Sequence, residues 1–246
     1  MQVIALKGLP LVKRGDDIGE LIAHAAEKNG PCVENGDVVV VAQSIVSKAE
    51  GDIVDLRTVR PGLLAQRLAE RLDKDPREVE VILEQSKEIV RLGHVIISRT
   101  KHGFVCANAG VDHSNVEPEH VTLLPDDPDA SAERIRSAIK QIAGVDVAVI
   151  ISDTQGRPFR LGAVGVAIGV AGISPLLDLR GRRDLYGKEL KVTITSPADA
   201  LAAAAVAIMG EADEGTPVVI IKGAIYKRGH GNARELVMPP ERDLFR

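Results

Sequence analysis

Short apolar runs predict strands along this chain, and apolar residues at helical spacing predict helices between them. Strands are expected over residues 2–6, within GDVVVVAQS (36–44), over 145–152 and within TPVVIIKG (216–223). The valine run in the second segment is apolar at every position, which is typical of a strand covered on both faces. HVIISRT and FVCANAG flank Lys101, His102 and Gly103, and this pattern predicts a hairpin.

Four segments carry the periodicity of helices. They are 18–28, 61–92, 132–143 and SPADALAAAAVAIMG (196–210). The expected N-caps are Asp16 or Asp17 for the first segment, Asp129 or Ser131 for the third, and Ser196 for the fourth. The DKDP sequence is expected to divide the second segment into two helices. SIVSKAEGDIVDL is expected to turn back from the valine strand into a second short strand.

The fourth helical segment has the clearest boundaries. Pro197 is expected in its first turn, Asp199 in a capping-box-like pair with Ser196, and Gly210 at its end. The glycines of RLGAVGVAIGVAG (160–172) lack the strand, turn and helix of a dinucleotide fingerprint. They are expected instead to allow another backbone to approach closely.

The mixture of hairpins and helices predicts an α+β fold with mixed and antiparallel sheets, rather than a doubly wound parallel sheet. Residues 1–246 are expected to form a single domain. The alternative is two lobes, with a boundary at 70–100 or 210–220. No flexible linker separates the two halves of the chain.

Composition narrows the class of partner. The chain of 246 residues is 45% hydrophobic but only 2% aromatic and has no Trp, so stacking recognition of single-stranded nucleic acid is not expected. With a net charge of −4, the chain has no overall positive potential that would attract nucleic acid or an anionic membrane. Cys32 and Cys106 are expected to be reduced, buried thiols. No signal peptide or membrane-length apolar run is evident, which favours a soluble, cytoplasmic protein.

Acidic residues follow three apolar or small-residue segments. They are Asp112 in NAGVDHSN, Asp153 in ISDTQG, and Glu211, Asp213 and Glu214 in MGEADEG. Carboxylates at the ends of elements can bind Mg²⁺ or Mn²⁺, which prefer oxygen ligands. Each is also compatible with an ordinary turn, because Asp and Gly are common turn residues.

Asp153 has the most informative neighbours. Thr154 adjoins it, and Arg157 and Arg160 follow directly. Guanidinium groups next to a cation-binding carboxylate suit a phosphate site, although a surface ion-pair cluster is the alternative. In SIVSKAEG, the hydroxyls and Lys48 follow a strand and could also bind phosphate. The alternative is an ordinary solvated loop, since the chain contains no P-loop motif.

A second group of arginines lies in GRRDLYGKEL, which fits either a multiply anionic ligand or a salt-bridged dimer surface. The sequence contains no catalytic Ser-His-Asp order, no HExxH motif and no activated cysteine. Phosphoryl transfer by positioning and electrostatics is therefore favoured over covalent catalysis.

Taken together, GLPLVKRGDD, SIVSKAEG, NAGVDHSNV, SDTQGRPFRLGAVGVAIGVAG, GRRDLYGKEL and MGEADEGTP resemble the coenzyme F420-0:L-glutamate ligase family. The resemblance runs in order from about residue 7 to about residue 223. It implies an unusual α+β ligase fold that forms an intertwined homodimer. It also implies two sites for Mn²⁺ or Mg²⁺, stimulation by K⁺, and GTP as cosubstrate.

The resemblance assigns roles to residues motif by motif. The implied nucleotide site comprises Leu9, Pro10, Leu11, Val12, Gln43, Ser44, Lys48, Asn115, Met209, Gly210, Glu211, Ala212, Asp213, Glu214, Gly215 and Thr216. Asp112 and Asp153 would hold one metal, and Thr154 and Glu211 the second. Asp153, Arg157 and Arg160 are the expected catalytic residues. Arg157, Arg160 and Arg182 could hold the phosphodiester of the acceptor or the carboxylates of the incoming glutamate.

The implied reaction uses GTP to join the amine of L-glutamate to the carboxylate of the phospholactyl tail of F420-0. It passes through an acyl phosphate and yields GDP and phosphate. Two other functions fit the same acidic segments. One is a metal-dependent nucleotide phosphohydrolase, and the other is a non-catalytic nucleotide- or metal-binding protein.

Overall fold

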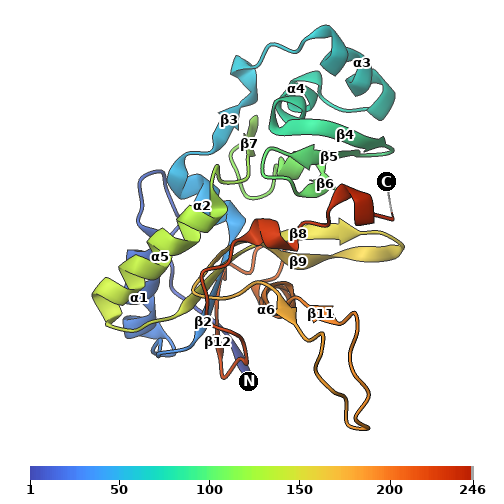
Figure 1. The fold of residues 1–246 in the computed structure, drawn as a ribbon. Coiled ribbons are helices and arrows are strands. Elements are labelled where there is room, and N and C mark those ends of the chain that lie inside the picture. The colour runs from blue at the N-terminus through green and yellow to red at the C-terminus, as the bar shows by residue number, and fades with distance from the viewer. Residues whose placement is uncertain (245–246) are drawn as a thin grey trace.

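A five-stranded sheet forms the body of the protein in a computed structural model that describes residues 1–244 (Figure 1). Its strands lie in the order β1 (Gln2–Ala5), β12 (Val218–Lys222), β2 (Val38–Ala42), β8 (Ala148–Arg157) and β9 (Arg160–Ala171). β2 and β8 are parallel, and the other neighbouring pairs are antiparallel. This mixed sheet, flanked by helices, confirms the predicted α+β class.

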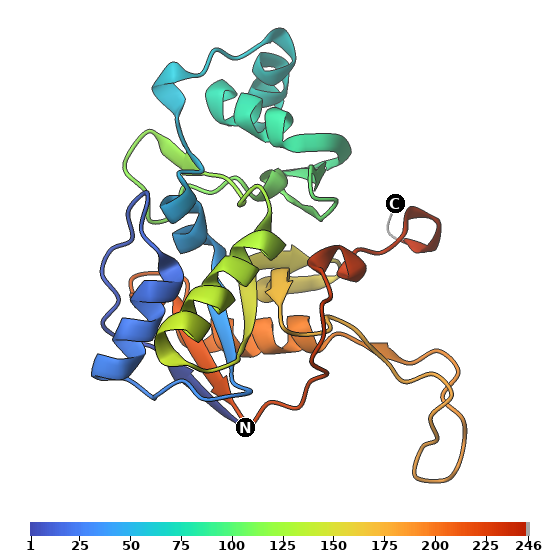
Figure 2. The ribbon, with the colours of Figure 1, turned by 60° about the vertical axis from the view of Figure 1, so that its left-hand side comes forward.

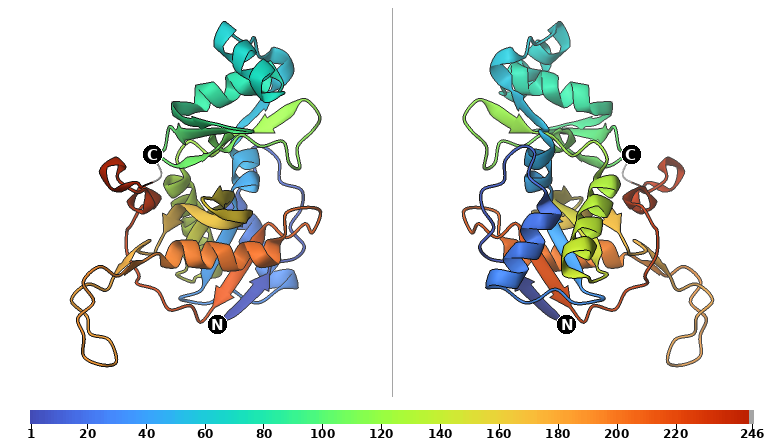
Figure 3. Two further views of the ribbon diagram at one scale, coloured as in Figure 1. Left: turned by 90° about the vertical axis from the view of Figure 1, so that its right-hand side faces the viewer. Right: turned by 90° about the vertical axis from the view of Figure 1, so that its left-hand side faces the viewer.

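Helices cover both faces of this sheet. α1 (Ile18–Asn29), α2 (Gln43–Glu50) and α5 (Pro128–Ala143) lie on one face, and α6 (Pro197–Met209) lies on the other (Figure 3). Val39 and Val41 of β2 point into the first core, whereas Val38 and Val40 point into the second. The predicted coverage of this strand on both faces is therefore confirmed.

Residues 53–122 form a smaller unit, here called the inserted lobe, above one end of the sheet (Figure 2). Its elements are β3 (Ile53–Asp55), η1 (Leu56–Thr58), α3 (Leu63–Leu72), α4 (Pro76–Gln85), β4 (Ser86–Leu92), β5 (Ile96–Thr100), β6 (Val105–Ala107), η2 (Asn108–Gly110) and β7 (His120–Thr122). β4, β5 and β6 form one sheet, and β3 pairs with β7. The lobe has its own apolar cluster, so its packing is separate from that of the body.

Two further segments project from or cross the body. Residues 177–195, here called the arm, run out from β10 (Leu177–Asp178) and return through β11 (Ile194–Thr195) (Figure 3). The C-terminal segment carries η3 (Ala233–Leu236) and η4 (Pro240–Arg242) and lies beside β8 and β9 (Figure 1). No helix of residues 1–244 combines the length and apolar character needed to cross a membrane.

Most predicted elements are confirmed, including the β5–β6 hairpin and the helix that follows Ser196. The Ser196 side chain accepts a hydrogen bond from the Asp199 backbone N–H at 3.1 Å. The Asp199 carboxylate does not complete a capping box with Ser196, because it accepts a hydrogen bond from the Ala167 N–H of β9 instead. The expected glycine packing is confirmed at Gly165, which lies against the backbone of α6, but is wrong at Gly162, where an added Cβ would meet no atom within 4 Å.

Three predicted boundaries are wrong. Asp127 caps α5, whereas Asp129 lies inside the helix and accepts hydrogen bonds from Val170 and Ala233. Residues 43–50 form helix α2, not a turn, and Gly51 ends it at a φ of 86°, but the predicted second short strand follows as β3. Residues 86–92 form strand β4 instead of continuing the helix, because they pair with β5.

Candidate active site

A large cavity lies between the body and the inserted lobe and has a volume of about 1170 Å³. Its floor follows from the parallel pairing of β2 and β8, in which Ala42 is the partner of Ser152. The residues directly beyond this pair lie at the same edge of the sheet, where β2 ends and β8 continues. Gln43 and Ser44 therefore come beside Asp153 and Thr154.

Segments distant in the sequence complete the walls. The cavity is lined by residues 9–14, the start of α2, the segment after η2, the end of β8 and the segment after α6. All sixteen residues predicted for the nucleotide and all four predicted for metals line it. The structure thus brings Asp112, Asp153 and Glu211 to one cavity from three separate parts of the chain.

Asp153 is an acidic group of the cavity whose pKa is strongly raised by its surroundings. Burial raises its pKa to about 6, and the nearby charges of Asp112 and Glu211 add to this effect. A hydrogen bond of 2.8 Å from the Gln155 side-chain amide to Oδ2 partly opposes the rise in pKa. The ionised carboxylate is therefore destabilised here unless a positive charge joins it.

The donor atoms fit divalent cations. Within residues 1–244, no three His, Cys, Asp or Glu side chains form a metal-binding group, and neither Asp112 nor Asp153 makes an ion pair. Mg²⁺ typically binds through one or two carboxylates together with water and substrate phosphates. Uncompensated carboxylates in a large cavity match that requirement, whereas a cage made wholly of protein ligands is absent from the described residues.

Two side-chain contacts link the segments around the acids. Thr154 Oγ1 donates to Glu211 Oε1 at 2.7 Å, joining β8 to the segment after α6. Asn115 Nδ2 donates to the Ala212 carbonyl at 3.4 Å, joining the inserted lobe to that same segment. The cavity is therefore bridged by polar contacts on two sides.

Lys48 is the cationic group of α2 that lines the cavity. Its Nζ donates to the Asn115 carbonyl at 2.7 Å, which ties the helix to the inserted lobe. Burial lowers its pKa, and Asp112 opposes that change. An anion entering the cavity would favour the charged amine.

Residues 209–216, here called the acidic loop, are held by contacts within the loop. Gly210 has a φ of 73°, in the region that favours glycine, and stands against the Glu214 carboxylate. Glu214 accepts a hydrogen bond from the Ala212 N–H at 2.8 Å. Thr216 Oγ1 donates to the Met209 carbonyl at 2.9 Å. This folding directs Glu211 toward Thr154.

Two predicted catalytic residues do not line this chain's cavity. Arg157 and Arg160 pair at the tip of the β8–β9 hairpin, where Arg157 donates to the Gly162 carbonyl. Each strand residue advances about 3.3 Å, so Arg157 lies about 13 Å beyond Asp153 along β8. Closeness in sequence did not bring these guanidinium groups to the acids.

Sequence reasoning also missed two features of the site. Gln155 lies two residues beyond Asp153 on the same strand, and the two-residue period of a strand was the available signal for its proximity. Cys106 is buried and lines the cavity, where burial and Asp153 raise the pKa of its thiol to about 12. The expectation of burial was wrong for Cys32, which is exposed.

Comparisons with known proteins agree with this architecture. The sequence model of the F420-0:Gamma-glutamyl ligase family matches residues 8–223. A coenzyme F420:L-glutamate ligase of Methanothermobacter thermautotrophicus is 53% identical, with 100% of this chain and 99% of the relative covered. Proteins of the same name from Methanopyrus kandleri and Archaeoglobus fulgidus are 50% and 42% identical, with 100% of this chain and 99% and 96% of the relatives covered. By these full-length matches, the chain belongs to the F420-0:gamma-glutamyl ligase family.

Proposed function

We propose that this protein is a GTP-dependent ligase that joins L-glutamate to coenzyme F420-0. The glutamate amine would form an amide with the carboxylate of the phospholactyl tail, with GDP and phosphate as the other products. The convergence of Asp112, Asp153 and Glu211 in one large cavity carries this proposal. Family membership supplies the identity of the substrates.

Four side chains would hold two divalent cations, Mn²⁺ or Mg²⁺. Asp112 and Asp153 would bind one, and Thr154 and Glu211 the other; the 2.7 Å contact between the latter two supports their common role. The bound cations would neutralise negative charge that builds on the phosphoryl and acyl oxygens. K⁺ is proposed as an activator.

The nucleotide would occupy the cavity between the N-terminal wall and the acidic loop. Leu9, Pro10, Leu11 and Val12 supply a mainly apolar wall, and Gln43 and Ser44 lie at the edge of the sheet beside the acids. Lys48 would pair with a phosphate, since its amine is partly buried and lies near Asp112. The acidic loop would close over the nucleotide through the Asn115 contact with Ala212.

Two displacements would complete the reaction. An oxygen of the tail carboxylate attacks the γ-phosphorus of GTP, the bond to the β-phosphate oxygen breaks, and GDP leaves. The neutral amine of glutamate then attacks the acyl carbonyl, phosphate leaves with the electron pair of the C–O bond, and the new amide nitrogen loses a proton. Neither displacement requires a covalent bond to the protein.

We further propose an intertwined homodimer. Large apolar side chains are almost fully exposed at the β8–β9 tip and on the arm: Phe159, Leu161, Leu185 and Tyr186. Exposed apolar groups on projecting segments favour burial against another chain. In that assembly, Arg157 and Arg160 would contact an anionic part of the substrate, since they do not line the cavity of their own chain.

The test is incubation of the purified protein with GTP, Mn²⁺, K⁺, L-glutamate and F420-0, followed by mass spectrometry. Products heavier by glutamyl units, formed only when every substrate is present, are expected. Phosphate release from GTP without glutamate or F420-0 would instead indicate a phosphohydrolase. Nucleotide binding without turnover would indicate a binding protein.

The metal assignment is tested with Asp153→Asn and a matched control, Asp213→Asn. Both positions line the cavity, but only Asp153 is assigned to a cation. Asp153→Asn should abolish turnover and weaken Mn²⁺ binding by at least tenfold in calorimetry, while Asp213→Asn should keep Mn²⁺ binding. Equal Mn²⁺ affinity in both variants would contradict the assignment.

A further inference from the structure

We propose that a second cavity, formed by the inserted lobe, β9 and the C-terminal segment, binds the planar ring system of the acceptor. This inference rests on the proposed ligase function. It places the deazaflavin ring in a cavity separate from the one that holds the three acidic residues. The tail of the acceptor would then reach the acids by passing Gln155.

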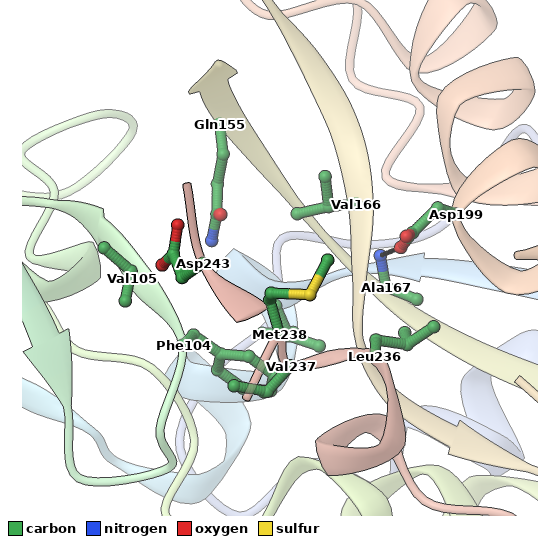
Figure 4. A pocket seen from close by; sticks show the side chains of 11 residues that line it. Phe104, Val105, Gln155, Val166, Ala167, Asp199, Leu236, Val237, Met238 and Asp243 are labelled. Carbon is green, nitrogen blue, oxygen red and sulfur yellow. Dashed lines mark hydrogen bonds between the residues drawn. The ribbon is translucent and has the colours of Figure 1, made fainter. Parts of the chain in front are cut away.

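This second cavity has a volume of about 240 Å³. Its lining comprises Phe104, Val105, Gln155, Val166, Ala167, Ile168, Asp199, Leu236, Val237, Met238 and Asp243, most of which Figure 4 labels. Pockets that enclose a whole drug-sized ligand usually measure about 300–1000 Å³. The size therefore suits one part of a larger molecule.

The chemistry of the lining suits an apolar, planar group. Aromatic and aliphatic side chains predominate, and the charged groups among the lining residues are the carboxylates of Asp199 and Asp243. The Asp199 carboxylate accepts a hydrogen bond of 2.9 Å from the Ala167 N–H, which Figure 4 draws. A planar ring would bury apolar surface against these side chains.

Gln155 connects this cavity to the acidic site. It is the residue that lines both cavities, and its amide donates to Asp153 Oδ2 at 2.8 Å. Figure 4 shows its side chain extending into the second cavity from β8. A molecule seated in the second cavity would therefore have Asp153 one side chain away, close enough for an attached tail to reach the reacting phosphoryl group.

The C-terminal segment supplies a wall that lies beyond the region matched by the family model, which ends at residue 223. Leu236, Val237 and Met238 belong to this wall. The segment is anchored at Ala233, whose N–H donates to the Asp129 carboxylate of α5 at 3.0 Å. This anchor ties the wall to the helix layer of the body and makes it a fixed part of the cavity.

Met238 is the position to change, because it lines the cavity and is still 55% exposed. Met238→Trp would fill the space, and Met238→Glu would add a charge. Ile225→Glu is the matched control, since Ile225 is 99% exposed and does not line either cavity. Thermal unfolding of each variant would verify that the fold is retained.

Each variant is assayed for product by mass spectrometry, with the KM of F420-0, GTP and glutamate measured separately. We expect both Met238 variants to raise the KM for F420-0 at least tenfold and to leave the other two within twofold. A deazaflavin that lacks the phospholactyl tail should inhibit competitively against F420-0 in the wild type, and Met238→Trp should remove this inhibition.

Two results would overturn the assignment: an unchanged KM for F420-0 in both Met238 variants, or an equal rise for all three substrates. Either result in an active wild type would refute the ring site alone. Absence of product from the wild type would refute the proposed function instead, so the two failures are distinguishable.

Discussion

Removing the charge of Asp153 should stabilise the metal-free protein even as it abolishes activity. Burial and two neighbouring acids raise the pKa of this carboxyl group from 3.8 to about 6. One pKa unit corresponds to about 1.4 kcal/mol, so keeping the group ionised costs the folded state about 3 kcal/mol above pH 7. Asp153→Asn retains an oxygen that can accept the hydrogen bond from Gln155 but carries no charge.

The sign of the pH dependence follows from proton binding. Between about pH 4 and pH 6, the folded state holds the proton of Asp153 while the unfolded chain has lost it, so wild-type stability falls as pH rises through that interval. The advantage of Asp153→Asn should therefore be near zero at pH 4 and about 2–3 kcal/mol at pH 8. For a chain of this size, that gain corresponds to a rise in Tm of about 5–10 °C.

The assay is urea unfolding at pH 4 and pH 8 in the presence of EDTA, followed by circular dichroism. Asp213→Asn serves as the control, because Asp213 is exposed in the acidic loop and its replacement should change stability by less than about 0.5 kcal/mol. Equal stability of Asp153→Asn and wild type at pH 8, or an equal gain at both pH values, would refute the reasoning. The expected outcome would mean that a functional charge is maintained at the expense of stability.

Three other substitutions have defined outcomes. Burial, together with two nearby carboxylates, raises the pKa of half-buried Asp52 to about 6. After allowance for solvent screening, Asp52→Asn should gain about 1 kcal/mol at pH 8 and nothing at pH 4 in urea unfolding; a gain independent of pH would argue against this cause. Gly165→Val would place its Cβ 2.6 Å from the α6 backbone, so urea unfolding should show a loss of about 1–3 kcal/mol in the free energy of unfolding. Gly156→Val meets no neighbouring atoms and should change that free energy by less than about 0.5 kcal/mol. Ser47→Ala removes a buried hydroxyl that donates to the Leu123 carbonyl at 2.7 Å, and thermal unfolding should show a loss of about 1–3 kcal/mol. An unchanged Tm would show that this bond to the residue directly after the inserted lobe contributes little.

Local signals predicted the elements whose causes are themselves local. Ser196 and Gly210 bound α6 as expected, because capping and left-handed termination depend on adjacent residues. Residues 86–92 were misread as helix because their apolar spacing continues that of α4. Only pairing with β5 makes them a strand, and that contact is not encoded in a short window of sequence.

The candidate site likewise has some residues that local motifs predicted and others that only the tertiary structure placed. The motifs around Asp112, Asp153 and Glu211 identified carboxylates at the ends of elements, and a strand period of two residues would have added Gln155. The arginine positions could not be judged from sequence spacing, because β8 continues to Arg157 and carries the hairpin tip away from the acids. The C-terminal wall of the second cavity had no recognisable motif and was found only through its contacts.

The sequence by itself determined an α+β chain with apolar strands, well-marked helices and acidic groups suited to cations and phosphate, since each of these depends on neighbouring residues. Tertiary structure decided which groups meet. The parallel register of β2 and β8 and the insertion of residues 53–122 bring acids from three distant segments to one cavity. That meeting depends on long-range pairing and on packing between the two lobes, which no short stretch of sequence specifies.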